Sequence, residues 1–120
     1  MPFSDNSAVD VIFDAKPAGG PSATVDLLPY NRLLVVVTPI ACTQGTLTFE
    51  GSIDGQLWYE LALKSTETSQ VVRTVSLGGV TGTRAYSMYL EDSATAYFRV
   101  NLTANVQGQR LTIKARKENA

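Results

Sequence analysis

The chain has 120 residues and a formal net charge of −1 at pH 7, with 44% hydrophobic and 18% charged residues. This length and composition are typical of one globular domain with a single core, and they argue against intrinsic disorder. Ten Lys and Arg residues are scattered among eleven Asp and Glu residues, so no basic stripe indicates a nucleic-acid partner.

The first segment, MPFSDNSAVD, has neither the basic region nor the apolar stretch of a signal peptide. No window approaches the eighteen or so apolar residues that a membrane-spanning helix needs. Cys42 is the single cysteine, so it cannot form an internal disulfide bond. We therefore expect a protein that is made in the cytoplasm, stays soluble and has no membrane partner.

Short runs rich in β-branched and aromatic residues recur about every eight to twelve residues, between clusters of Gly, Pro, Asn, Asp and Ser. The pattern predicts an all-β fold, a two-sheet antiparallel β-sandwich of jelly-roll-like type with about eight to nine strands. We expect one domain over residues 1–120, with an N-terminal arm at 1–7 and a C-terminal tail at 117–120. The expected strands are 8–14, 23–28, 32–38, 46–53, 57–64, 70–77, 84–90, 96–103 and 109–116.

Two stretches depart from simple alternation of apolar and polar residues. LLVVV, residues 33–37, is an unbroken apolar run, which predicts a central strand covered on both faces, by the other sheet and by a loop or a partner. AKPAGGPSA, residues 15–23, contains two prolines and a Gly-Gly pair, so we expect a loop that joins no strand ladder.

The segment FEGSIDGQLWYEL, residues 49–61, predicts a β-hairpin. A three-residue loop over residues 54–56 places Glu50 opposite Glu60 and Gly51 opposite Tyr59. We prefer this register to that of a two-residue loop, which would push polar groups into the core. One face of the hairpin then carries the expected core residues Leu47, Phe49, Ile53, Leu57, Tyr59, Leu61 and Leu63.

We interpret Ser52, Asp54 and Gly55 as structural residues of the turn. The Asp54 carboxylate is expected to accept backbone N–H bonds, and Gly55 to adopt the left-handed conformation. Trp58, the single tryptophan, is expected to pack over the turn and shield its backbone bonds.

Glu50 and Glu60 lie on the other face of the hairpin, with Cβ atoms about 5 Å apart. Three interpretations stay open: a retaining-glycosidase pair with Trp58 as a sugar platform, a calcium site, or a wet sheet face. On a wet face the two carboxylates splay into water or meet an arginine such as Arg99. We favour this last interpretation, because an open sheet has no cleft that excludes water.

The sequence has no histidine, which removes the commonest general base and the commonest metal ligand. It also has no cysteine pair for zinc and no Gly-rich phosphate loop followed by a lysine. We therefore expect no enzymatic activity, no catalytic residue, no metal and no cofactor.

The stretch SIDGQLW, residues 52–58, resembles the Ser-x-Asp-Gly-x-x-Trp hairpin of discoidin-type domains and of small β-sandwich proteins in tailed-bacteriophage virions. In the phage proteins a strand such as GTLTFEGS precedes the hairpin, and strands such as AYFRVNLTA and RLTIKAR follow. These pieces occur here in that order, over roughly residues 33–116. The resemblance to discoidin-type jelly rolls is looser, and their aromatic-x-Arg strand corresponds to Tyr97, Phe98 and Arg99.

The resemblance implies a non-enzymatic structural protein of a bacteriophage virion, a capsid decoration or cement protein that stabilises the head by subunit contacts. Two alternatives stay open, a tail or fibre-adaptor component and a carbohydrate-binding jelly-roll module. The virion interpretation implies synthesis in the bacterial host cytoplasm and two kinds of partner. One is the major capsid protein or another virion protein, and the other is the chain itself, in a homotrimer or other cyclic oligomer.

The candidate interface residues lie near the two ends of the chain. They are Pro2 and Phe3 in the expected arm, and Lys114, Arg116 and Lys117 at the C-terminus. The face that carries Glu50, Trp58 and Glu60 is the second candidate surface, for a ligand or a partner.

Overall fold

The computed structural model describes residues 8–14, 20–39, 45–77, 82–90, 95–103 and 111–119. None of these segments forms an apolar helix of membrane-spanning length. The described residues contain twelve β-strands: β1 Ala8–Asp14, β2 Gly20–Pro21, β3 Val25–Asp26, β4 Arg32–Pro39, β5 Thr46–Ser52, β6 Tyr59–Glu60, β7 Leu63–Ser65, β8 Val71–Val72, β9 Thr74–Ser76, β10 Arg84–Tyr89, β11 Tyr97–Thr103 and β12 Leu111–Glu118.

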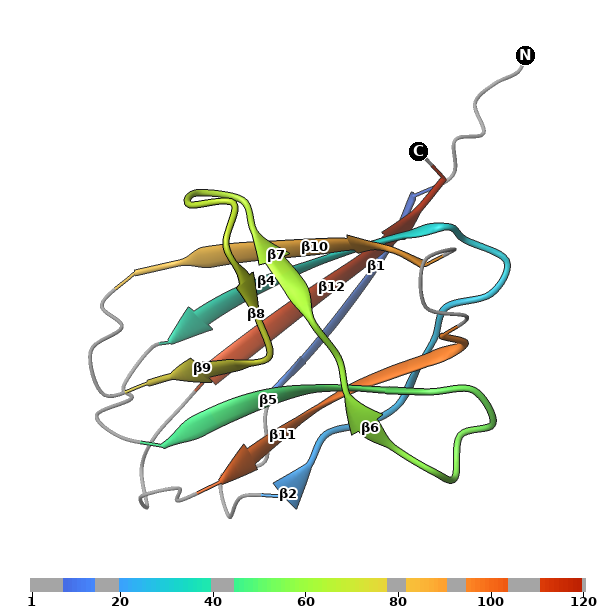
Figure 1. Cartoon of the computed structure of the whole chain (residues 1–120), viewed down its shortest axis with the longest axis horizontal. Helices are drawn as coiled ribbons and strands as arrows, with labels where there is room; N and C mark the ends of the chain where they lie inside the picture. The colour runs from blue at the N-terminus through green and yellow to red at the C-terminus, as the bar shows by residue number, and fades with distance from the viewer. Residues whose placement is uncertain are drawn as a thin grey trace.

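The strands form two antiparallel sheets that face each other (Figure 1). The first sheet has six strands in the order β1-β12-β4-β10-β7-β8. The second sheet has the order β2-β11-β5-β6, with β3 also paired to β11 and β9 also paired to β5. Early and late strands are therefore interleaved in both sheets, so the two halves of the chain cannot separate without breaking strand ladders.

The all-β, two-sheet prediction is confirmed, but the number of strands is twelve rather than eight to nine. The expected strands 57–64 and 70–77 each cross from one sheet to the other. The first becomes β6 and β7, and the second becomes β8 and β9. A strand that changes sheets must break its ladder at the crossing, and a period-two pattern does not mark that point.

Two further boundaries differ from the prediction. Gly20 and Pro21 were expected in a loop, but they pair with Leu102 and Asn101 of β11. A proline at the edge of a sheet needs no ladder donor, which is why β2 tolerates it. At the other end β12 runs through Glu118, so residues 117–118 belong to a strand and not to the expected tail.

The core fills the space between the sheets. Phe49 of the second sheet packs against Tyr86 of the first, with ring centroids 5.2 Å apart, and Phe98 lies 6.3 Å from Phe49. The expected central strand is β4, between β12 and β10. Its residues 33, 35 and 37 are fully buried, whereas 34 and 36 are half-buried, so the second face is covered less than expected.

Candidate functional site

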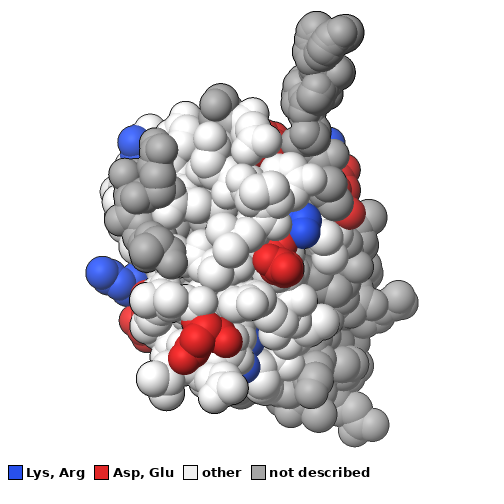
Figure 2. Space-filling model, turned by 90° about the vertical axis from the view of Figure 1, so that its right-hand side faces the viewer, with Lys and Arg blue, Asp and Glu red and all other residues white. Residues whose placement is uncertain are grey.

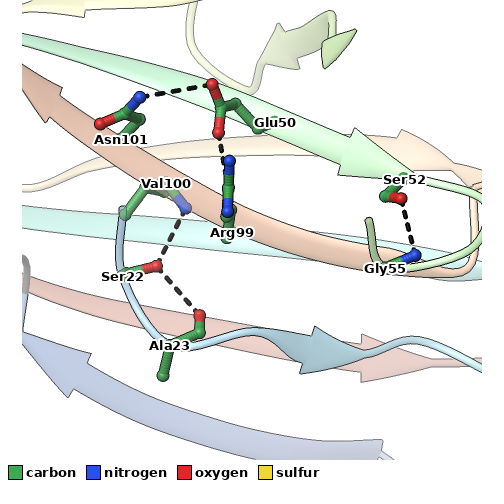
Figure 3. A network of polar contacts seen from close by, with 8 residues as sticks. All are labelled: Ser22, Ala23, Glu50, Ser52, Gly55, Arg99, Val100 and Asn101. Carbon is green, nitrogen blue, oxygen red and sulfur yellow. Dashed lines mark hydrogen bonds and ion pairs between the residues drawn. The ribbon is translucent and has the colours of Figure 1, made fainter. Parts of the chain in front are cut away.

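The turn after β5 has the hydrogen bonds that the sequence predicts. The Ser52 hydroxyl accepts the Gly55 N–H at 2.8 Å (Figure 3), and the Asp54 carboxylate accepts the N–H groups of Gln56 and Leu57 at 2.8 and 3.0 Å. These backbone donors, Leu57 first, hold the pKa of Asp54 below its ordinary value. Gly55 has φ +82°, the left-handed conformation.

The predicted register holds only in the part of the hairpin away from its tip. Glu50 pairs with Glu60 and Gly51 with Tyr59, as expected. Beyond that point Ser52 leaves the hairpin and lies opposite Tyr97 of β11, and its carbonyl accepts the Ala96 N–H at 2.9 Å. Residues 53–58 therefore form a wide loop instead of a three-residue turn.

The wide loop corrects three predicted core positions. Ile53 is 65% exposed, Leu57 is 77% exposed and Tyr59 is 37% exposed. The other expected core residues of the hairpin, at positions 47, 49, 61 and 63, are buried. Without ladder partners, the side chains of Ile53 and Leu57 no longer alternate into the core.

Glu50 meets Arg99 across the β5–β11 ladder. The Arg99 Nε donates to Glu50 Oε1 at 2.7 Å, and the Asn101 amide lies 3.4 Å from Oε2 (Figure 3). The Arg99 guanidinium also lies over the Trp58 ring, 4.0 Å from its centroid. Glu50 and Arg99 are mostly buried, at 16% and 22% side-chain exposure, so the pair is better shielded than an ordinary surface ion pair.

This arrangement favours the wet-face interpretation of the two glutamates. Both oxygens of Glu50 have donors within the chain, while Glu60 is exposed. A carboxylate committed to a guanidinium is a poor nucleophile and a poor calcium ligand. Among the described residues, no group of three or more Asp, Glu, Cys or His side chains is placed to hold a metal ion.

Two aromatic rings lie near this part of the hairpin, and they have different neighbours. A Cβ placed at Gly55 would meet first the ring of Tyr97, at 3.6 Å, so Tyr97 is the aromatic residue closest to the turn glycine. The Arg99 guanidinium lies over one face of Trp58, and the packing of Trp58 over the turn stays a prediction. The ligand or partner role of Glu50, Trp58 and Glu60 stays a prediction.

The basic residues near the C-terminus hold neighbouring segments of the chain. The Arg116 guanidinium bonds both oxygens of Asp10, at 2.6 and 3.1 Å, and Lys114 lies 3.2 Å from the same carboxylate. Chiefly through the Arg116 bond, the pKa of Asp10 falls from 3.8 to about 2. The Lys117 ammonium donates to the Asp26 carbonyl at 2.6 Å. These contacts join β1, β12 and the β3 region.

The partner role predicted for these residues is not decided by their contacts within the chain. Pro2 and Phe3 lie outside the described residues. Residues 114, 116 and 117 are engaged with the chain itself, so a partner would meet them as an already ordered surface.

An apolar surface at one end of the sandwich was not anticipated. Leu28 is 62% exposed and, together with Ile53, borders a pocket of about 440 Å³ whose wall includes Leu90 and Ala96. Leu57 belongs to the same loop as Ile53. We call Leu28, Ile53 and Leu57 the apolar end. Figure 2 views the molecule from this side, and uncharged residues make up most of the described surface there.

A sequence signal for the apolar end does exist in retrospect. Leu28 directly precedes Pro29, and the clash with the proline ring excludes helical geometry at the preceding residue, so Leu28-Pro29 reads as an extended or turn dipeptide. Ile53 and Leu57 flank the tight Asp-Gly turn, where a loop wider than three residues leaves both side chains outside the core.

The comparisons with known proteins identify the fold. No family model and no curated protein matches the chain. The SPBc2 prophage-derived protein YomS has a similar structure, with a TM-score of 0.72 at 10% identity, over 97% of this chain and 98% of that one. The PBSX exported protein XepA matches with a TM-score of 0.74 at 15% identity, over 98% of this chain and 39% of XepA. The chain therefore shares its fold, over nearly its whole length, with two phage-derived proteins.

Proposed function

We propose that this chain is a non-enzymatic structural protein of a bacteriophage particle, and specifically a decoration protein on the outside of the capsid. The observation that carries the proposal is the match of the whole sandwich to two phage-derived proteins, one of which it covers from end to end. A shared fold is an analogy at the level of architecture, so the presence of this chain in particles must be tested directly.

The strand order also supports the proposal. From β4 onward, each long strand lies in the opposite sheet from the long strand before it: β4, β10 and β12 in the first sheet, and β5 and β11 in the second. We assign this connectivity to the jelly-roll class, an architecture that viral capsid proteins use repeatedly.

The apolar end supplies a surface for subunit contacts. Three large aliphatic side chains with 62%, 65% and 77% exposure lie on loops, where they contribute nothing to the core. Leu28 and Ile53 border the same pocket, and a group of exposed apolar side chains marks an interaction site more often than ordinary surface does. In the proposed function this end contacts a second copy in a cyclic oligomer such as a trimer, or the major capsid protein.

Purified particles provide the test. We expect mass spectrometry of density-purified particles to find this chain in many copies, and immunogold labelling to place it on the heads. Label on the tails would replace the decoration role with the tail or fibre-adaptor role. Absence of the chain from purified particles would overturn the proposal in both forms.

A further inference from the structure

A groove opens where the chain passes from the second sheet to the first. β7 pairs with β10 through Ser65 opposite Tyr86 and Lys64 opposite Ser87. Towards β6 the chain turns away, because the Leu61 N–H bonds the Phe49 carbonyl of the second sheet at 2.8 Å. Figure 1 shows β7 beside β10 and the chain descending from there to β6. The diverging strands leave a groove of about 480 Å³, within the usual size of small-ligand sites.

Two tyrosine residues line the groove, and neighbouring residues hold their side chains in place. Tyr59 is 37% exposed, and its hydroxyl is hydrogen-bonded to the Thr95 hydroxyl at 2.9 Å. Tyr89 is 49% exposed and lies beneath the Arg32 guanidinium, 5.7 Å from the ring centroid. Arg32 is itself fixed by Glu118 at 2.9 Å. Rings ordered in advance lose little conformational entropy when a ligand binds.

Polar groups with unused hydrogen-bonding capacity lie beside these rings. Glu60, Lys64 and Ser87 all line the groove. Within the part of the chain that the structure describes, none of these three side chains has a hydrogen-bond or ion-pair partner. They offer a carboxylate acceptor, an ammonium donor and a hydroxyl that serves as either.

We propose that this groove binds an oligosaccharide. A sugar ring presents an apolar C–H face to an aromatic ring and, around its rim, hydroxyl groups that both donate and accept hydrogen bonds. The tyrosines match the first feature, and Glu60, Lys64 and Ser87 match the second. A purely apolar ligand would leave the charged rim unpaired.

The Lys64–Ser87 pair marks the end of the β7–β10 ladder, so these two polar residues lie where the groove begins. Trp58 is not among the residues that line this groove, so its substitution distinguishes this site from the Trp58 face. The site goes beyond the proposed role in the particle and does not depend on it.

Binding of the full chain to an array of defined bacterial and mammalian oligosaccharides tests the inference. We expect at least one oligosaccharide to bind, and Tyr89→Ala and Glu60→Gln each to weaken its Kd by about tenfold or more in calorimetry. Amide signals of Lys64 and Ser87 should shift when that oligosaccharide is titrated into the labelled protein. Both substituted residues are exposed, and unchanged thermal unfolding would show that the variants fold.

Trp58→Ala is the matched control, since it removes an aromatic ring outside the groove and should leave the Kd within about twofold. An array without hits would overturn the inference, and so would binding that Trp58→Ala abolishes while Tyr89→Ala leaves it intact. Peptide binding in the groove with no sugar binding would overturn it as well. None of these outcomes bears on whether the chain is present in particles.

Discussion

At Gly51, the backbone of β5 passes close to side chains from three other segments. A Cβ at this position would lie 2.9 Å from Thr95 Cγ2, 3.1 Å from Leu61 Cδ1 and 3.2 Å from Tyr59 Cε1. The missing side chain lets the ring of Tyr59, the cross-strand partner, lie over the backbone and reach Thr95. We therefore expect Gly51→Ala to lower the free energy of unfolding by about 1–3 kcal/mol, as overpacking does in other cores.

Urea denaturation of the two proteins measures this difference. Gly82→Ala is the control, because nothing lies within 4 Å of a Cβ at Gly82 and its φ is not in the left-handed region. Equal destabilisation by the two substitutions would show that the Gly51 contacts are not tight, and that the loss comes from glycine replacement in general.

The turn shows how far residue chemistry alone predicts structure. Ser52, Asp54 and Gly55 act through groups within three residues of one another, so their roles follow from side-chain type and spacing. Ile53 and Leu57 were placed in the core on the same local reasoning, and that placement was wrong. Their exposure depends on β11 pairing with Ser52, a contact from more than forty residues away in the sequence.

At the scale of elements, the Glu50–Arg99 ion pair links the neighbouring strands β5 and β11. Removing Arg99 would leave a mostly buried carboxylate with one weak amide donor. We expect Arg99→Ala to cost about 2 kcal/mol of unfolding free energy. The indole of Trp58 would lose its cover, so its fluorescence emission should shift to the red.

Arg73→Ala is the matched control for the loss of an arginine, because Arg73 is exposed and its side chain has no ion-pair partner among the described residues. Thermal unfolding and the emission spectrum should both stay close to those of the parent protein. If Arg99→Ala behaved in the same way, the ion pair would contribute nothing to the ladder.

The attachment of β1 to β12 should depend on pH. In the folded chain the pKa of Asp10 is about 2, against an ordinary value of 3.8, mainly because Arg116 bonds the ionised form. The unfolded chain therefore binds this proton more readily than the folded chain does. The stabilisation is complete above about pH 4 and is lost as the pH falls through about 2.

Asp10→Asn tests this linkage. We expect the variant to unfold at a lower temperature than the parent at pH 6, and the difference to shrink steadily towards pH 2. Arg116→Ala should show the same narrowing, since it removes the other half of the pair. A difference that stays constant from pH 6 to pH 2 would contradict the assignment to Asp10.

For the whole molecule, alternation in the sequence predicts the two sheets but not the paths between them. β11 alternates along its whole length and β5 as far as Gly51, and the sequence predicts both strands to within one residue at each end. The run 57–64 also reads as one strand, because every second residue is apolar: Leu57, Tyr59, Leu61 and Leu63. The change of sheet within that run creates the groove. The place of the change depends on which neighbouring strand each part of the run pairs with, β5 for residues 59–60 and β10 for residues 64–65.

The last prediction concerns self-association of the chain through the apolar end. If Leu28, Ile53 and Leu57 contact a second copy, a charge placed among them must be desolvated on association, which opposes it strongly. We expect Ile53→Asp to convert an oligomer into a monomer in light scattering after size-exclusion chromatography. Because Ile53 is 65% exposed, the substitution should leave the thermal unfolding of the monomer nearly unchanged.

Val71→Asp separates this effect from a general effect of added charge. Val71 is 64% exposed, almost the same as Ile53, but it lies on β8 in the other sheet. Its substitution should leave the oligomer intact. A parent chain that is monomeric at every concentration tested would overturn self-association through the apolar end. An oligomer that survives Ile53→Asp and dissociates with Val71→Asp would move the subunit contact to the side of the sandwich where β8 lies.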